Sequence, residues 1–335
     1  WLVAWALLAL ALTAVAVVVT VRRGERSARM PGVTSTPEAN AVARIVPGLV
    51  LVVPTEVRSR LVDDAWMRLG VMSLLAQALD GLPGHAIVPD ATALAAATQA
   101  HDDVDRLRAT TGATLVITTS AEHAGDDWVL DATLLRAGGG TQVVSARAAD
   151  PVVAATALAR NLRELLSPAG ASAERPALPP EILALTTRMR AAILEGQNGR
   201  VLALVARASP AVATAPDVIL LHAEALQQLG RVSEAASMLQ TLVGRAVSGS
   251  APAWLPGAST LLGDGDLAQG HPAAAEIHFR HSLDLLGVHG DRQSSGLAWR
   301  GLGIAQAMRN DFDGAEASYL QARLELQPIG DRLLL

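Results

Sequence analysis

Between residues 44 and 168, segments with the hydrophobic pattern of β-strands alternate with segments that have the pattern of α-helices. The apolar run at 45–54 has prolines near its ends and predicts a buried strand. Residues 61–79 repeat apolar positions at helical spacing, with two aspartates in the first turn, and predict an amphipathic helix. The short apolar run at 85–89 predicts a second strand. Together these segments open a mixed α/β domain.

The same reading predicts the remaining elements of this domain. Two short helices are expected to end near residue 110, and β-branched or alternating residues predict strands at 113–119, 128–135 and 141–147. Asp150 followed by Pro151 is typical of a helix N-terminus and predicts a helix over 151–166. No glycine-rich phosphate-binding loop follows any of the expected strands.

A 40-residue interval marks the region after residue 180. A turn residue is followed five positions later by Ala, and four further on by a large apolar residue, in three sets: Gly230, Ala235 and Leu239; Gly270, Ala275 and Phe279; Asn310, Ala315 and Tyr319. Small residues allow two helices to approach closely, and large residues fill the groove between them. The pattern predicts stacked helix pairs.

The last of these units also resembles a named repeat class. Trp299, Leu302 and Gly303 match the W-x2-L-G part of the tetratricopeptide pattern, and Gln306 stands where that pattern has Tyr. A degenerate first repeat is expected around Gly199. The usual tetratricopeptide period of about 34 residues is shorter than the interval found here.

Residues 1–21 carry no charged side chain, and Arg22 and Arg23 follow at once. As a helix this run would span roughly 31 Å, close to the ~30 Å of a hydrocarbon core, so it predicts a transmembrane helix. A cleaved signal peptide is the alternative, but its apolar run is usually only about 7–15 residues long and follows a basic region. The basic flank after residue 21 favours the cytoplasm for that side, while the opposite flank cannot be counted.

These readings give an α+β multidomain fold class with five parts. They are a single transmembrane helix at 1–21, a linker at 22–43, a mixed α/β domain at 44–168, a linker at 169–180 and an all-α tetratricopeptide-like repeat array at 181–335. Because the chain starts at Trp1 and stops at Leu335 without a polar capping helix, we expect it to be a fragment of a longer protein.

The amino-acid composition excludes several kinds of catalytic and binding site. All 27 basic residues are Arg, so there is no lysine for a P-loop, a Schiff base or a kinase strand. There is no cysteine for a disulfide, a thiolate nucleophile or a metal site. The net charge of −5 argues against a nucleic-acid surface over the whole chain. Abundant Ala and Arg without Lys is typical of a high-GC bacterial coding bias.

Clusters of titratable residues have simpler interpretations than catalysis. His278 and His281 lie three residues apart near Glu276, where a polar helix face is favoured over a metal site. Asp264 and Asp266 alternate with glycines and predict a turn that interrupts a helix. Asp102, Asp103 and Asp105 lack the EF-hand spacing and favour a solvated helix N-terminus. We therefore predict no catalytic residue, no cofactor and no metal.

The order of parts resembles the C-terminal half of the CadC/ToxR-type membrane-anchored winged-helix regulators. The resemblance is carried by the apolar helix at 1–21, the strand and helix of 44–79, the helix-to-strand segment 106–116, the strand 128–135 and the repeats. It implies a TolB-like α/β sensor domain and a DNA-binding winged-helix domain upstream of this chain. DNA would then be a partner only through that missing domain.

This resemblance implies signalling through the membrane helix, with a protein partner or small-molecule signal on the repeat surface and a homodimer as one means of transmission. The expected partner-binding residues are Ala223, Leu226, Leu302 and Gln306, together with the junction between the α/β domain and the repeats. The expected location is the bacterial inner membrane, with the residues after 21 in the periplasm and the cytoplasm as the alternative. Two other functions stay open: the accessory region of a membrane protein kinase or nucleotide cyclase, and a cell-envelope repeat scaffold that binds protein partners.

Overall fold

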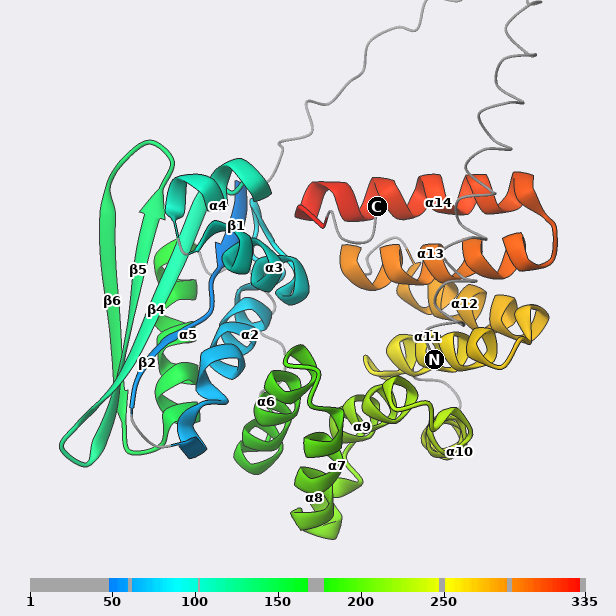
Figure 1. Ribbon diagram of the computed structural model, residues 1–335, viewed down its shortest axis with the longest axis horizontal. Helices are drawn as coiled ribbons and strands as arrows, with labels where there is room; N and C mark the ends of the chain where they lie inside the picture. Colours follow the sequence, from blue (N-terminus) through cyan, green and yellow to red (C-terminus); the bar gives the residue numbers. More distant parts are fainter. Residues whose placement is uncertain are drawn as a thin grey trace, which may run out of the picture. The chain divides into compact units, whose positions relative to one another are not determined.

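The computed structural model describes residues 48–59, 62–101, 103–167, 178–246, 251–287 and 291–331 (Figure 1). Contacts within the chain divide it into Trp1–Arg44 and Ile45–Leu335, and all described residues belong to the second of these compact units. The α/β elements and the helical repeats therefore form one unit. The predicted linker at 22–43 and most of that at 169–180 lie outside the described residues.

The described part of the α/β region is built on a six-stranded mixed sheet in the order β3-β1-β4-β5-β6, with β2 paired to β4. The strands are β1 (Gly48–Val52), β2 (Glu56–Arg58), β3 (His85–Ile87), β4 (Leu115–Ala124), β5 (Asp127–Arg136) and β6 (Thr141–Ala148). β1 runs parallel to β3 and β4, and β4, β5 and β6 form antiparallel neighbours. The predicted mixed α/β architecture of this region is thus confirmed. β2 was missed because three residues are too few to show a period.

Helices cover both faces of this sheet. α2 (Met67–Leu79) and α5 (Pro151–Leu166) pack on one face, where Val50, Ile117 and Leu130 are fully buried. α3 (Asp90–Ala100) and α4 (Val104–Thr111) pack on the other. Parallel strands that are apolar on both faces require such two-sided cover. These packing layers fix α3 at one side of the sheet, where the site described below is formed.

The sequence predicted the start of α5 correctly but placed the start of α2 too early. α5 begins as predicted, because the Asp150 carboxylate accepts hydrogen bonds from the backbone N–H groups of Val152 and Val153. The helix predicted over 61–79 starts later, at Met67, and Val62–Asp64 forms a separate 3-10 turn. Asp64 is held there by a 2.5 Å hydrogen bond from the Ser59 hydroxyl, so its carboxylate is not in the first turn of α2.

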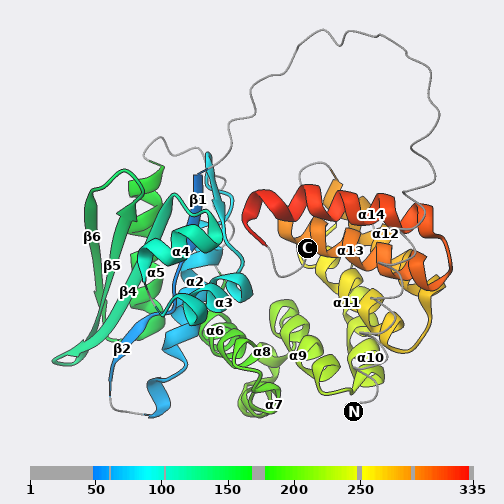
Figure 2. The ribbon, with the colours of Figure 1, turned by 45° about the horizontal axis from the view of Figure 1, so that its top comes forward.

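The repeat region consists of antiparallel helix pairs with one short additional helix. Its helices are α6 (Pro180–Leu194), α7 (Asn198–Arg207), α8 (Pro210–Ala213), α9 (Pro216–Gln228), α10 (Val232–Val243), α11 (Leu255–Ala268), α12 (Pro272–Leu286), α13 (Arg292–Met308) and α14 (Phe312–Leu326), followed by the 3-10 turn η3 (Gln327–Ile329). The first helices of the pairs, α6, α9, α11 and α13, neighbour one another in order. We call them the inner helices (Figure 2).

One turn geometry links the two helices of every pair. Gly196, Gly230, Gly270 and Asn310 all have left-handed backbones, with φ of 70°, 77°, 77° and 65°. In each case the next backbone N–H bonds to the carbonyl five residues back, the 6→1 bond of a Schellman cap. The first interval is 34 residues and the next two are 40. The first turn is therefore at Gly196, and the predicted centre at Gly199 is wrong because Gly199 lies inside α7.

Leu239 and Phe279 fill the space between helices as the repeat pattern predicts, whereas Tyr319, at the same position of the last repeat, is 40% exposed. Phe279 is fully buried, and a β-carbon on Gly263 would stand 2.8 Å from its ring. The predicted turn at Asp264 and Asp266 is wrong, because α11 continues through both residues. Gly263 is there for close packing, not for chain reversal.

The membrane assignment needs correction. Among the residues that the structure describes, no helix has the length and apolar character needed to cross a membrane. The segment predicted to do so, 1–21, lies outside those residues. The predicted single transmembrane helix, and with it the inner-membrane location and the periplasmic placement of later residues, is not supported. That prediction was based on the uncharged run, the arginines that follow it and its poor match to a signal peptide.

Candidate binding groove between the sheet domain and the repeats

The repeat helices contact the α/β elements at their first end through α2 and α6. The ring of Trp66 lies against Gly70, where a β-carbon would stand 2.7 Å from Cε3 of the indole and 3.1 Å from a methyl group of Thr187. The guanidinium carbon of Arg188 lies 5.0 Å from the centre of the same ring, within the range of a cation–π contact. Gly70 is thus required for the close approach of α2 and α6.

The far end of the repeats also contacts the α/β elements. The Thr92 hydroxyl of α3 donates a 3.1 Å hydrogen bond to the Asp331 carboxylate, and both side chains are buried. Leu326 and Ile329 form a small apolar cluster with Ala86 of β3. Contacts at both ends therefore hold the inner helices opposite α3.

A pocket of about 460 Å³ lies between α3, α6 and α9. Its apolar wall consists of Ala91, Leu94 and Ala95 from α3 and Ile193 and Leu194 from α6, and its polar residues are Glu224 and Gln228 from α9. We call this pocket the junction groove. Its volume falls within the roughly 300–1,000 Å³ of ligand sites in proteins. The groove lies at the junction where sequence reasoning expected binding.

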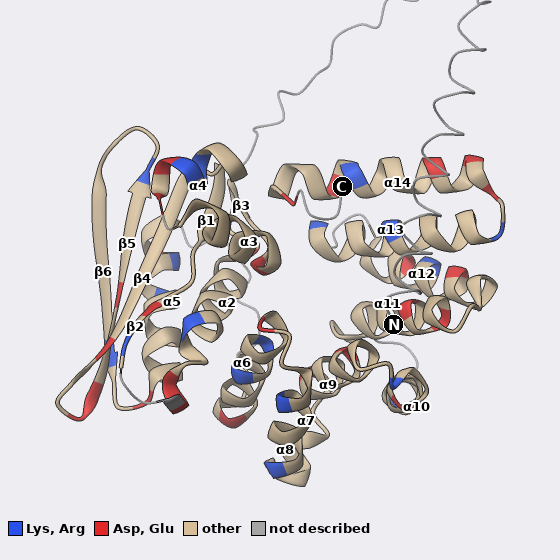
Figure 3. Cartoon of the chain, viewed as in Figure 1, with Lys and Arg blue, Asp and Glu red and all other residues tan. Residues whose placement is uncertain are grey.

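Charged side chains continue from this groove along the inner helices. Asp90 of α3, Arg190 of α6, Glu224 of α9, Asp264 of α11 and Arg300 of α13 are each partly buried. Figure 3 shows acidic positions on α3 and α11 and basic positions on α6 and α13. Charge interactions couple neighbouring members, from Asp90 to Arg190, then to Glu224, Asp264 and Arg300. This charged row contains three carboxylates and two guanidinium groups.

Burial changes the acidity of all three carboxylates in the row. Loss of solvation raises the pKa of Asp90, against the opposing effects of a hydrogen bond with Ser73 and the charge of Arg190. Loss of solvation also raises the pKa of Glu224, again opposed by Arg190. The pKa of Asp264 is raised to about 6 by burial, with Arg300 opposing and the negative charge of Glu224 adding to the effect. Perturbed groups that gather beside a pocket are typical of functional sites.

Direct pairing within the charged row is weak. Within the described part of the chain, none of the three carboxylates forms an ion pair shorter than 4 Å. Glu224 accepts only a long 3.4 Å hydrogen bond from the Gln228 amide. The Nε of Arg300 is buried without a hydrogen-bond partner. By contrast, Arg231 and Glu234 on the outer surface form a 2.6 Å ion pair. Among the described residues, the carboxylates of Glu224 and Asp264 and the Nε of Arg300 thus keep unused capacity for hydrogen bonds.

Glu224 and Asp264 occupy the same position in successive repeats, 40 residues apart. Each directly follows the small packing residue of its helix, Ala223 or Gly263. Sequence reasoning missed Glu224 and assigned Asp264 to a turn. The signal that could have found both is the recurrence of an acid at one repeat position, next to the residue that faces the paired helix.

The four predicted partner-binding residues lie inside the helix pairs. Ala223 and Leu226 belong to the apolar cluster shared by α9, α10 and α11. Leu302 packs in the cluster around Phe279, and the buried Gln306 side chain accepts a 2.6 Å hydrogen bond from Ser318. These side chains stabilise the repeats and are not presented on a surface.

The histidine cluster on α12 is also accounted for by packing. The buried Glu276 carboxylate pairs with Arg280 at 2.5 Å and with Arg309 of the next helix. His278 lies 3.6 Å from Asp266, and His281 lies 3.1 Å from the Ser259 hydroxyl. No group of three residues that could hold a metal ion occurs among the described residues. These contacts join α11, α12 and α13.

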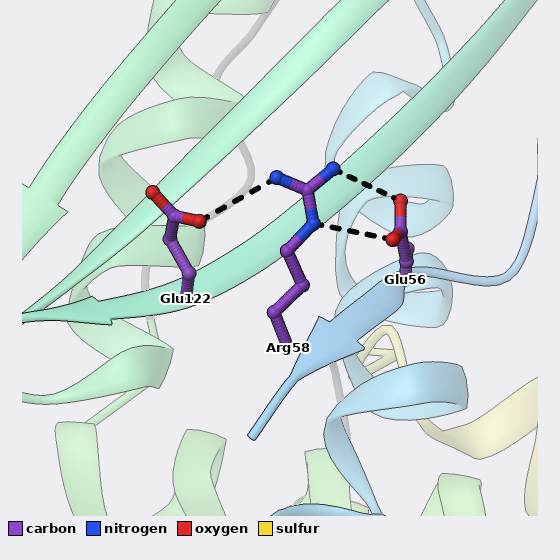
Figure 4. A network of polar contacts seen from close by, with 3 residues as sticks. All are labelled: Glu56, Arg58 and Glu122. Atoms are coloured by element: carbon purple, nitrogen blue, oxygen red, sulfur yellow. Dashed lines mark hydrogen bonds and ion pairs between the residues drawn. The ribbon is translucent and has the colours of Figure 1, made fainter.

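Two further acidic groups have structural roles. Asp103 caps α4 by accepting hydrogen bonds from the backbone N–H groups of Asp105 and Arg106, whereas Asp102 lies outside the described residues. At the end of the sheet, Arg58 bridges Glu56 at 3.1 Å and Glu122 at 3.5 Å (Figure 4). This exposed network connects β2 to β4.

No protein-family model matches the chain, and no curated protein matches it. Together with the lack of a membrane-spanning helix in the described residues, this leaves the CadC/ToxR-type assignment without support. The predicted role in transcription regulation and the assignment of the repeats to the tetratricopeptide class are likewise not supported. What the structure shows instead is a mixed α/β sheet joined to helix-pair repeats, with a groove where the two meet.

Proposed function

We propose that this chain is a non-catalytic binding module that holds an extended segment of a protein partner in the junction groove. The observation that carries the proposal is the groove itself, an apolar pocket lined also by the partly buried carboxylate of Glu224, which lies where the repeats meet the sheet elements. Inner surfaces of helical repeat arrays are commonly used as extended binding surfaces.

The walls of the groove suit side chains of a peptide. Leu94, Ile193 and Leu194 are only partly buried, so an apolar side chain placed against them would remove further area from water. Burial of apolar area contributes roughly 25 cal/mol per Å². The neighbouring carboxylates and the amide of Gln228 would then fix the direction of the bound segment through hydrogen bonds.

Catalysis fits the described residues less well. The closest arrangement to a nucleophile and base is Ser259 with His281, whose Oγ and Nδ1 are 3.1 Å apart. The Ser259 side chain is only 1% exposed, so a substrate could not reach its hydroxyl. A nucleophile has to contact the reacting atom of its substrate. We therefore retain the prediction that the chain is not an enzyme.

A peptide-display selection tests this proposal. Random peptides are selected on immobilised wild-type protein and counter-screened on Ala91→Trp, which fills the groove from an exposed position on α3. Ala273→Trp on exposed α12 is the matched control. We expect peptides that bind wild type and Ala273→Trp but not Ala91→Trp. Selected peptides that bind all three proteins equally would show that the groove is not the binding site.

A further inference from the structure

The junction groove combines five apolar lining residues with a single anionic one. Leu94 and Ala95 of α3 face Ile193 and Leu194 of α6 across it, and Glu224 supplies the single charged side chain of the lining. A ligand group that matches this arrangement has an aliphatic stem and a positively charged tip. Lysine is the side chain with that form, since a four-carbon stem ends in a compact ammonium group.

We propose that the junction groove accepts a lysine side chain from a partner protein, with its stem along the wall of α3 and α6 and its ammonium group at Glu224. This inference rests on the proposed function and adds the chemical class of the residue that is recognised. The 335 residues of this sequence contain no lysine, and the proposal commits to another protein as the source.

Charge balance in the row supports a cationic ligand. Asp90, Glu224 and Asp264 carry three negative charges when ionised, against two positive charges from Arg190 and Arg300. When all five groups are ionised, the row therefore carries one more negative charge than positive charges. Burial disfavours that charge, as the raised pKa of Glu224 indicates. A cation bound beside Glu224 would remove the imbalance, and this gain would be realised only on binding.

The geometry favours lysine over arginine. Arginine recognises a carboxylate best through two parallel hydrogen bonds to both oxygens, whereas an ammonium group needs only one. In the groove one Glu224 oxygen already accepts a hydrogen bond from Gln228. A guanidinium that engages both oxygens would have to share that oxygen with Gln228, whereas an ammonium group can bind the other oxygen alone.

Methyl-resolved NMR tests the inference at the groove itself. The full chain, labelled at its Ile and Leu methyl groups, is titrated with the blocked peptide Ala-Ala-Lys-Ala-Ala and with the same peptide containing norleucine or arginine. Saturable shifts of Ile193 and Leu194 report the groove, and the exposed Ile277 of α12 is an internal reference. We expect the lysine peptide to bind about tenfold more tightly than the norleucine peptide, as for a hydrogen bond to a charged group.

Two variants test whether the difference in affinity between the lysine and norleucine peptides depends on Glu224. In Glu224→Gln the lysine and norleucine peptides should bind alike, whereas Glu234→Gln on α10 should keep the tenfold difference. Equal binding of lysine and norleucine by wild type, tighter binding of arginine, or no shift at Ile193 with any peptide would each overturn the inference. The proposed function is judged separately, because display-selected peptides without lysine that are blocked by Ala91→Trp would still support it.

Discussion

Gly263 of α11 lies so close to the ring of Phe279 that a β-carbon at position 263 would stand 2.8 Å from the ring. Gly301 of α13 meets the same ring from the next helix pair, also without room for a side chain. Phe279 is therefore the residue through which two successive repeats are joined, and the two glycines are the reason that it fits. The inner helices keep their order because of such contacts.

Gly301→Ala is expected to destabilise the protein by about 1–3 kcal/mol. The added methyl group would overpack the contact with Phe279, and this strain is larger than the stabilisation from the higher helix propensity of Ala. Urea denaturation measures this change. Gly199→Ala on α7 is the control, because a β-carbon there meets nothing within 4 Å and should be neutral or stabilising. Adding Phe279→Leu should reduce the cost of Gly301→Ala. Equal stability of wild type and Gly301→Ala would refute the contact.

Asn310→Gly is expected to stabilise the last helix pair by roughly 0.5–1 kcal/mol. Asn310 has a φ of 65°, a left-handed conformation in which glycine carries no steric penalty. Gly270→Ala, at the equivalent turn with φ of 77°, should destabilise by a similar amount. Thermal unfolding followed by circular dichroism compares the two. The two substitutions should change the melting temperature in opposite directions. A stabilising effect of Gly270→Ala would contradict the shared turn geometry.

Asp331→Ala is expected to release the end of the repeats from α3. Thr92 and Asp331 are 7% and 2% exposed, so removal of the carboxylate leaves a buried hydroxyl without its acceptor, at about 1–3 kcal/mol. Hydrogen exchange should become faster in α14 and η3 before it changes in β4 or β5. Asp313→Ala, on the exposed start of α14, is the control. Unchanged exchange in α14 would show that this contact does not hold the repeats to the sheet.

Asp264 gives the protein a specific dependence on pH. Its pKa is raised from 3.8 to about 6, so the folded state binds its proton more tightly than the unfolded state. Stability from this group is present below about pH 4 and is lost as the pH rises to about 6. Asp264→Asn should therefore be more stable than wild type at pH 7.5, by roughly 2 kcal/mol, with little difference near pH 4. Urea unfolding at both pH values decides this, and an equal difference at the two pH values would contradict it.

Features set by neighbouring residues could be predicted from the sequence. The pair Asp150 and Pro151 located the start of α5, and the spacing of Gly230, Gly270 and Asn310 located three of the helix turns. These signals are local, since a cap or a turn depends on a few adjacent backbone groups.

The junction was expected from the sequence, but the residues that line the groove could not be predicted, because they come from three separate stretches of the chain, at 91–95, 193–194 and 224–228. Spacing alone also did not separate the packed side of an inner helix from its open side. Leu226 and Gln306 were therefore assigned to binding, although they are buried. Gly263 was taken as a helix breaker because its packing partner, Phe279, lies on another helix.

The most direct test of the central claim is the affinity of one display-selected peptide, measured by fluorescence anisotropy on three proteins. Wild type and Ala273→Trp should bind it with the same Kd, and Ala91→Trp should bind it at least about tenfold more weakly, a loss of about 1.4 kcal/mol. Thermal unfolding of all three proteins controls for folding. Undiminished binding by a folded Ala91→Trp would contradict the claim that the junction groove is the binding site.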